Sequence, residues 1–464
     1  MGIRAAVLRG VTWRSLGLIG CETLVILCCV YAAAVFRFGW EDAYTGGNGL
    51  WKAGLIALVT QVSLYFADLY DLRVIADRRE LFVGAVQALG ATCVILAGLY
   101  YWFPYLVVGR GVLAYSTGLI VSLVFGWRLL FEWTMRQIGP RDRLLLVGTS
   151  DGAVRLAREL HERRDLAVAI VGFIDPDPER IGSPVFNPGI IGTIEDIPAI
   201  VRARSVDQVV VSLSDARGKL PMDKLLDMKL EGVQFEHLAS VYEKYTGKIA
   251  VENLRPSWLI FSDGFRKSRL QHVAKRATDL ALSALGLIVA APLVALVAIV
   301  VKLTSRGPVL YRQQRVGLHG RVFQAYKFRS MQHDAERETG AVWATRNDTR
   351  VTPVGRLMRQ TRIDELPQLW NILCGHMSLV GPRPERPEFV SELTREIPFY
   401  GQRHTVRPGL TGWAQVRYTY AASVEDAMEK LQYDLFYVKN MSLALDLFII
   451  IKTIKTVLMR KGAQ

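Results

Sequence analysis

Cysteine and histidine are scarce in this sequence, with five and seven in 464 residues. No two cysteines form a CxxC pair, and no cysteine–histidine group has the spacing of a zinc site. These absences exclude a disulfide scaffold and a structural zinc domain, and the cysteines are expected to be small buried hydrophobic residues. Hydrophobic residues, in contrast, make up 51% of the chain, which excludes a disordered or collagen-like protein.

Acidic residues are outnumbered, since 57 Lys+Arg stand against 43 Asp+Glu and give a formal net charge of +14. A basic protein can bind nucleic acid, but here the basic residues cluster at the edges of apolar segments. Aromatic residues are not interleaved with them as in a nucleic-acid platform. We therefore expect no nucleic-acid partner, and we expect the charge to face anionic lipid head groups.

The first third of the chain has four apolar segments, separated by short polar breaks. About 20 apolar residues, rising about 1.5 Å each, cross a hydrocarbon core about 30 Å thick. Residues 1–138 are therefore predicted to form four transmembrane helices, and no cleavable signal peptide is expected. The segments are approximately 16–36, 50–67, 81–108 and 112–131.

Arginine is concentrated before the first segment, between the second and third, and after the fourth. The positive-inside rule therefore places the N-terminus and everything after the fourth segment in the cytoplasm. Glu22 lies within the first segment, where a charge is costly, so we expect it near the interface or facing a helix partner. The arginines are Arg4, Arg9, Arg14, Arg73, Arg78, Arg79, Arg136, Arg141 and Arg143.

Residues 139–252 alternate buried strands with amphipathic helices, which predicts a doubly wound parallel sheet of the Rossmann-like kind. The glycine turn Gly148–Gly152 lacks the full GxGxxG pattern, and Asp175 only loosely meets the acid expected downstream. We favour a structural or regulatory module over a dinucleotide site. The predicted strands are 144–147, 167–174 and 206–213, the predicted helices are 154–163 and 220–231, and residues 253–265 form a linker.

A fifth apolar run, 280–301, has basic residues on both sides and is interrupted at Ala291-Pro292. By hydropathy alone it is an ordinary fifth span, which would place the C-terminal domain outside the cell. A helix bent at Pro292 that begins and ends on the same membrane face agrees better with the charges. We favour this re-entrant helix, at about residues 278–303.

The remaining sequence, 266–464, is rich in arginine and in Gly/Pro turns and contains the adjacent acids Asp364 and Glu365. Arginine binds phosphate through two hydrogen bonds, and paired carboxylates can hold Mg²⁺ or attack phosphorus. Taken alone, the two acids are better explained as a helix N-terminus with Pro367 in the first turn. Beside the basic turns and the membrane helix, the catalytic interpretation is favoured.

Four motifs in this domain, KFRSM, DELPQLWN, MSLVGPRPE and PGLTGWAQV, occur in this order. With them the full chain resembles the bacterial polyprenyl-phosphate sugar-1-phosphate transferases, or monotopic phosphoglycosyl transferases. It is most similar to the long form, the undecaprenyl-phosphate glucose and galactose phosphotransferases that start exopolysaccharide or O-antigen units. The Thr-Arg-Ile-Asp-Glu version looks like the exosortase-associated exopolysaccharide subgroup.

The resemblance implies a ping-pong reaction with Mg²⁺ at the acid pair. Asp364 is implied as the nucleophile and Glu365 as its partner. Asp364 would attack the β-phosphate of a UDP-sugar, release UMP and pass the phosphosugar to undecaprenyl phosphate. The phosphate-binding candidates are Lys327, Arg329, Arg362 and Arg383.

The resemblance also implies a bacterial inner-membrane protein, membrane lipid as a partner and a homodimer through the middle domain. The fold class expected is thus a four-helix membrane region, a Rossmann-like α/β domain and an α-rich membrane-associated catalytic domain with a re-entrant helix. Residues 443–460 fit a helix lying in the membrane plane, or a core helix of the same domain. The chain departs from relatives at His376, where an acid is common, which leaves the choice of sugar open.

The alternative function is a non-catalytic membrane scaffold or sensor of a polysaccharide assembly complex. The intact Asp364-Glu365 pair argues against it.

Overall fold

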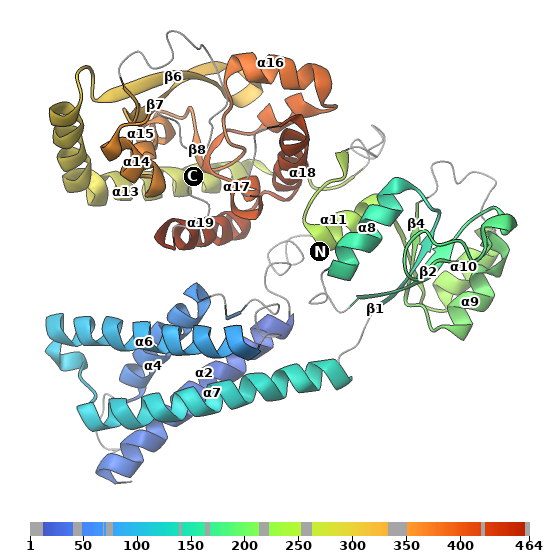
Figure 1. The fold of residues 1–464 in the computed structure, drawn as a ribbon, viewed down its shortest axis with the longest axis horizontal. Coiled ribbons are helices and arrows are strands. Elements are labelled where there is room, and N and C mark those ends of the chain that lie inside the picture. Colours follow the sequence, from blue (N-terminus) through green and yellow to red (C-terminus); the bar gives the residue numbers. More distant parts are fainter. Residues whose placement is uncertain are drawn as a thin grey trace. The chain divides into compact units, whose positions relative to one another are not determined.

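The structure is a computed structural model, and its chain divides into two compact units, Gly10–Glu236 and a C-terminal unit that begins at His237 (Figure 1). Each unit is described by itself. The residues described are 13–39, 49–67, 69–70, 78–138, 142–162, 168–212, 222–251, 262–332, 350–418 and 423–459.

The first unit opens with four apolar helices, as the sequence predicts. Their buried faces pack on one another in two clusters, one around Ile26 and Ile56 and one around Leu64 and Leu81. By length and composition α2, α6 and α7 could each cross a membrane, whereas α4 is a shorter apolar helix. The helices are α2 (Trp13–Phe38), α4 (Gly49–Phe66), α6 (Arg78–Trp102) and α7 (Arg110–Ile138).

The third apolar segment was expected to continue to residue 108, and this is wrong. Helix α6 ends at Trp102, and Pro104–Leu106 forms a separate 3-10 turn, η1. A residue that precedes proline is pushed out of the helical region, and Phe103 accordingly has φ −131° and ψ 77°. The proline, not hydropathy, therefore sets the end of this helix.

Glu22 faces a helix partner, which was one of the two expectations for it. Arg128 on α7 donates from Nε and Nη2 to the two carboxylate oxygens of Glu22, at 2.5 and 2.9 Å. Both side chains are fully buried, and the Arg128 guanidinium also donates to the Leu69 carbonyl and lies over the Tyr70 ring. The pair thus joins α2 to α7 inside an apolar bundle.

We predict that Arg128→Met destabilises the bundle by about 3–5 kcal/mol, because it leaves the Glu22 carboxylate buried and unpaired. Thermal unfolding of the detergent-solubilised protein measures this loss. The double variant Glu22→Leu/Arg128→Met, which buries no charge, should recover most of it. A single variant as stable as the wild type would contradict the prediction.

The rest of the first unit is a five-stranded sheet in the order β3-β2-β1-β4-β5, which confirms the Rossmann-like expectation. The β1–β2, β1–β4 and β2–β3 pairs are parallel. Helix α8 covers one face, and α9 and α10 pack on the other (Figure 1). The elements are β1 (Asp142–Val147), α8 (Asp151–Glu162), β2 (Val168–Ile174), β3 (Ile190–Gly192), α9 (Ile197–Ala203), β4 (Gln208–Val211), α10 (Met222–Leu230) and β5 (Gln234–His237).

The second unit begins earlier than the boundary expected at residue 252. Helix α11 (Leu238–Thr246) belongs to it, and Ile249 and Val251 are part of its hydrophobic core. The expected division therefore falls inside the C-terminal unit. Most of the predicted linker, 253–265, lies outside the described residues.

The C-terminal unit is mainly helical, as expected, with two small two-stranded sheets. Its largest core cluster joins α18 and α19 to the segments around Val380 and Trp413. The elements are α13 (Arg269–Thr304), β6 (Leu310–Val316), β7 (Val322–Phe328), α14 (Pro353–Gln360), η7 (Ile363–Glu365), α15 (Gln368–Leu373), β8 (Ser378–Val380), α16 (Pro387–Glu396), η8 (Tyr400–Thr405), β9 (Gly409–Thr411), α17 (Trp413–Arg417), α18 (Val424–Asn440) and α19 (Leu443–Leu458).

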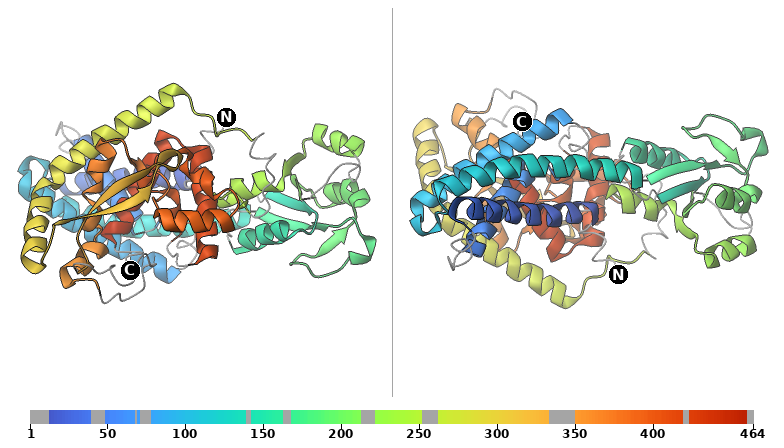
Figure 2. Two further views of the ribbon diagram at one scale, coloured as in Figure 1. Left: turned by 90° about the horizontal axis from the view of Figure 1, so that it is seen from above. Right: turned by 90° about the horizontal axis from the view of Figure 1, so that it is seen from below.

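Helix α13 contains the apolar run with Pro292 inside it, and it starts well before the predicted residue 278. Figure 2 shows the helix changing direction along its length. Its basic N-terminal residues do not all face lipid as expected, because two of them bind the protein. Lys275 Nζ lies 2.7 Å from Asp446 Oδ2, and Arg276 donates to the carbonyls of α15 at 2.7 and 3.0 Å. The N-terminal arm is therefore docked on its own domain.

Candidate active site

The two acids lie in the short turn η7, between α14 and α15. Arg362, just before this turn, has φ 57° in the left-handed region, and the chain changes direction there. Asp364 and Glu365 are 5% and 7% exposed, so both point inward. Helix α15 begins only at Gln368, after Pro367, which argues against the two acids acting as its N-terminal cap.

Glu365 is held between two cations. Lys327 Nζ and Arg383 Nη2 each lie 2.7 Å from Glu365 Oε1, and Arg362 Nη1 lies 3.9 Å away. Burial alone would raise the pKa of Glu365, but Arg383 and Lys327 outweigh it and hold the pKa well below the ordinary value. Glu365 is therefore a permanent anion at neutral pH.

Asp364 has the opposite environment. Its Oδ1 is buried and has no hydrogen-bond partner among the residues that the structure describes. Burial, followed by the neighbouring Glu365 charge, raises its pKa, and Lys327, Arg359 and Arg362 oppose this rise. One carboxylate oxygen is thus left free to accept a bond from a ligand or to attack one.

A buried asparagine places α15 against the β6–β7 hairpin that carries Lys327. Asn371 is fully buried; its Nδ2 donates to the Gln324 carbonyl at 2.7 Å, and its Oδ1 accepts from the Tyr326 amide at 3.0 Å. These bonds set Lys327 beside Glu365. Sequence reasoning assigned Asn371 no role, although an asparagine in the apolar segment QLWNIL is a signal for one.

Arg383 reaches the site from the loop after β8, and two glycines allow this loop to approach β9. Strand β8 pairs in parallel with β9, and the Gly409 amide donates to the Pro382 carbonyl at 2.9 Å. A Cβ on Gly409 would lie 2.1 Å from the Gly381 nitrogen, which no side chain tolerates. The contact between the GPRP and PGLTG motifs therefore requires glycine.

Three of the four predicted phosphate-binding residues lie near Glu365, and the fourth, Arg329, does not. Lys327 and Arg383 meet at Glu365, and Arg362 lies half exposed at the edge of the site. Arg329 does not join them; its Nη2 donates to the backbone and hydroxyl oxygens of Ser305, at the end of α13. Pro292 lies in α13, where its predicted role is a bend.

Arg359 is a site residue that sequence reasoning missed. Its Nε donates to the Ser330 hydroxyl at 2.9 Å, and its charge lowers the pKa of Asp364. The sequence could not show that Arg359 acts on Asp364, because the left-handed conformation of Arg362 turns the chain between them.

The residues fit Mg²⁺ only in part. Among the described residues there is no group of three or more Asp, Glu, His or Cys side chains. Mg²⁺ commonly keeps waters and substrate phosphates and takes only one or two carboxylates, so the free Asp364 Oδ1 suits it. Glu365 suits it less, because Lys327 and Arg383 already bind Oε1.

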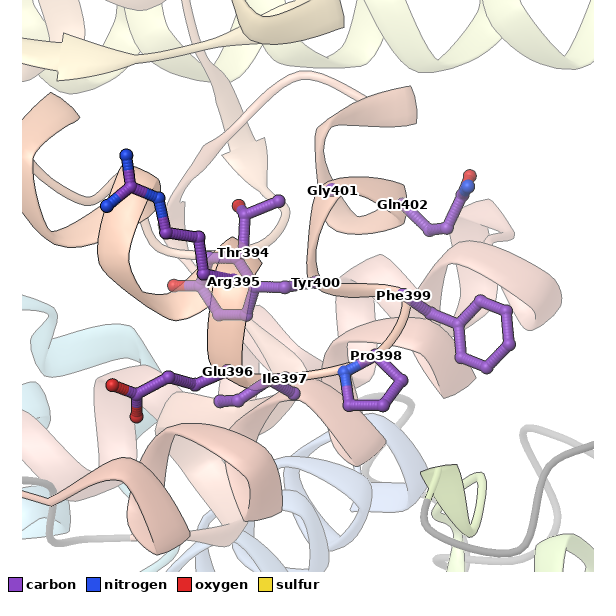
Figure 3. Close-up of a pocket in the computed structure, with 9 residues that line it drawn as sticks. All are labelled: Thr394, Arg395, Glu396, Ile397, Pro398, Phe399, Tyr400, Gly401 and Gln402. Carbon is purple, nitrogen blue, oxygen red and sulfur yellow. The ribbon is translucent and has the colours of Figure 1, made fainter.

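A separate hollow of about 430 Å³ is lined by Thr394–Gln402, at the end of α16 and the start of η8 (Figure 3). Neither acid of the pair lines it. We assign it no ligand.

A buried nucleophile candidate beside an ionised, cation-bound glutamate defines an enzyme site suited to phosphoryl transfer. Residues 270–460 match the family model described as bacterial sugar transferase, and residues 65–220 match one described as a CoA-binding domain.

Three named relatives support the match to the bacterial sugar transferase model. The undecaprenyl-phosphate glucose phosphotransferase of Komagataeibacter xylinus is 32% identical over 94% of this chain and 83% of its own length. The UDP-glucose:undecaprenyl-phosphate glucose-1-phosphate transferase of Xanthomonas campestris pv. campestris is 33% identical over 75% of this chain and 73% of its own.

The UDP-N-acetylgalactosamine-undecaprenyl-phosphate N-acetylgalactosaminephosphotransferase of Aeromonas hydrophila is 44% identical over 49% of this chain and about half of its own length, 53%. The chain therefore belongs to the bacterial sugar transferases, a family of phosphosugar transferases, which confirms the resemblance found in its motifs.

Among the described residues, the polar side chains that follow strands β1, β2 and β4 of the α/β domain bond one another. Asp175 is bound by the Thr149 hydroxyl at 2.6 Å and by Arg180 at 2.8 Å, and the hydroxyls of Ser150 and Ser212 bond each other. Asp151 opens α8, where a diphosphate would need a positive helix end. We assign this domain no ligand.

We predict that Glu365→Gln lowers the pKa of Asp364, because it removes the adjacent negative charge and leaves the cations to act on Asp364 alone. A ¹³C NMR titration of aspartate carboxyl carbons measures this pKa, with the signal assigned by its loss in Asp364→Asn. Glu396→Gln, at an exposed position on α16, is the control that should leave it unchanged. An Asp364 pKa that stays or rises in Glu365→Gln would contradict the arrangement.

Proposed function

We propose that the chain transfers a sugar 1-phosphate from a UDP-sugar to undecaprenyl phosphate and releases UMP. The names of the relatives support the reaction and the two substrates. They favour glucose as the sugar, and galactose remains a prediction. The structural observation behind the proposal is the unpartnered Asp364 Oδ1 beside an ionised Glu365.

The first half of the reaction forms a bond between an Asp364 carboxylate oxygen and the β-phosphorus of the UDP-sugar. The bond between that phosphorus and the oxygen of UMP breaks, and UMP leaves with the electron pair. In the second half an oxygen of the lipid phosphate attacks the same phosphorus, and Asp364 leaves as a carboxylate. Asp364 Oδ1 has no hydrogen-bond partner among the described residues, so no such bond has to break before it attacks.

Lys327 and Arg383 hold Glu365 ionised and place positive charge beside the reacting phosphate, where oxygens must be neutralised. Arg359 and Arg362 add charge on the Asp364 side. When bound, Mg²⁺ would neutralise diphosphate oxygens, and Asp364 is the side chain best able to hold it.

We further propose that α2, α4, α6 and α7 cross the bacterial inner membrane and that both the N-terminus and the transferase domain are cytoplasmic. Helix α13 then enters and leaves the membrane on the cytoplasmic face, bent near Pro292. Only 6% of its most apolar stretch is buried in the protein, so most of its apolar surface is exposed.

Helix α19 would lie along the same membrane surface. Leu447, Ile451 and Leu458 are exposed on one face, whereas Leu445 and Ile449 are buried in the domain core on the other. The interpretation as a core helix thus describes the buried face of this segment, and the interpretation as an in-plane helix describes its exposed face. A homodimer through the middle domain also remains a proposal, drawn from the resemblance.

We predict that Asp364→Asn lowers UMP release from UDP-glucose by on the order of 10³-fold or more, because an amide cannot serve as the nucleophile. UMP is measured with detergent-solubilised protein, Mg²⁺ and undecaprenyl phosphate. Asp263→Asn, an exposed aspartate of the same unit, is the matched control and should keep the wild-type rate. Near wild-type turnover by Asp364→Asn would remove the residue from this role.

We predict that Pro292→Leu straightens α13 and moves part of the population to a spanning topology, because the leucine restores the backbone N–H that proline lacks. Cys374 was expected to be buried but is exposed on the transferase domain, and it reports the side on which the domain lies. A membrane-impermeant maleimide, applied to intact spheroplasts with the other cysteines replaced, should label Cys374 only in the variant. Val289→Leu is the control, and an unlabelled Pro292→Leu protein would show that proline does not enforce the bend.

A further inference from the structure

The segment Gly381–Glu385, which carries Arg383 to the site, is fixed through its carbonyl groups. Pro382 and Pro384 have no N–H to donate, so most of the backbone hydrogen-bonding groups in this segment are carbonyls. Four successive carbonyls each accept one hydrogen bond, from β9, η8 and β6. They are Pro382 O from Gly409 N at 2.9 Å, Arg383 O from Arg403 Nη2 at 2.9 Å, Pro384 O from Arg315 Nη1 at 3.0 Å and Glu385 O from Val316 N at 2.9 Å.

Arg403 makes the bond to the Arg383 carbonyl from a buried position, with 5% of its surface exposed. Its Nε and Nη2 lie 3.1 and 2.7 Å from Asp434 Oδ2, and its Nη1 donates to the Tyr400 hydroxyl at 2.7 Å. All three nitrogens are therefore engaged at once. A lysine ammonium could keep the Asp434 pair but could not span the same three partners.

The turn before Arg403 orients this group. Phe399 has φ 61° in the left-handed region, and Figure 3 shows the side chains of Phe399 and Tyr400 pointing in opposite directions. Tyr400 is 2% exposed and so points inward, toward Arg403. The backbone turn thus brings the tyrosine hydroxyl and the guanidinium together under the Gly381–Glu385 segment.

We propose that Arg403, anchored by Asp434, is a positioning residue for the Arg383–Glu365 contact. By holding the Arg383 backbone, it sets the guanidinium 2.7 Å from Glu365 Oε1, and it acts on the reaction only through that contact. This inference rests on the proposed phosphosugar transfer for its kinetic consequence. A purely structural ion pair would stabilise the fold without any coupling to Arg383.

A double-mutant cycle separates these two roles. Arg403→Lys should lower kcat for UMP release about 10- to 100-fold while KM for the UDP-sugar changes less than about threefold. In an Arg383→Lys background, where the contact is already altered, the same change should cost less than about threefold. An equal fold-loss in both backgrounds would overturn the proposal, as would a wild-type rate in folded Arg403→Lys.

The matched control is Lys439→Met. It removes another buried ion pair of the same unit, Lys439–Glu243 at 2.7 Å, which joins α18 to α11. We expect its effect on kcat to be the same in both Arg383 backgrounds. Thermal unfolding of each variant confirms that the compared proteins are folded.

A second readout does not depend on activity. The Gly409 and Val316 amides donate to carbonyls of the Gly381–Glu385 segment. In Arg403→Lys, hydrogen exchange of the full chain in detergent should be faster at these two amides, and in Lys439→Met it should be unchanged there. Unchanged exchange in Arg403→Lys would overturn the placement. If the wild type released no UMP from any UDP-sugar, the proposed function would fail, whereas the exchange result would still decide whether Arg403 holds this segment.

Discussion

The pairing of Glu365 with Lys327 and Arg383 is the interaction on which the rest of the site depends. A buried carboxylate is costly unless cations meet it, and here two of them approach one oxygen at 2.7 Å. Asp364 beside Glu365 keeps a buried oxygen without a partner among the described residues, and burial together with the Glu365 charge raises its pKa. The two adjacent acids thus differ in their contacts, and Asp364 is the one that offers an unpartnered oxygen for the proposed attack on phosphorus.

The surrounding fold holds these three residues from separate elements. Asn371 fastens the helix after the acids to the hairpin that carries Lys327, and close-packed glycines let the Arg383 loop reach β9. Helix α13 is joined to the same framework through Lys275 and Arg276. The apolar helix and the acid pair are therefore parts of one compact unit, as the proposed transfer from a soluble to a lipid substrate requires.

Much of this could be predicted from the sequence. Long apolar runs, the strand–turn–helix alternation and the acid pair are local patterns, and the first two produced the expected helices and parallel sheet. Features set by tertiary contact could not be predicted. The short strands β3 and β5 carry little pattern, and Arg329 turns to Ser305 instead of the acids. The end of α6 was missed for another reason, because Pro104 is a local signal that hydropathy does not weigh. The role of Arg359 depends on a left-handed residue three positions later.

The central claim is that Asp364 carries the phosphosugar between the two substrates. It is tested most directly by mixing the solubilised protein with UDP-glucose and Mg²⁺ in the absence of the lipid acceptor, followed by rapid quenching and peptide mass spectrometry. The account predicts a burst of UMP, at most one per chain, with a hexose phosphate on the peptide that contains Asp364. UMP release that begins only when undecaprenyl phosphate is added, with no modified peptide, would contradict it.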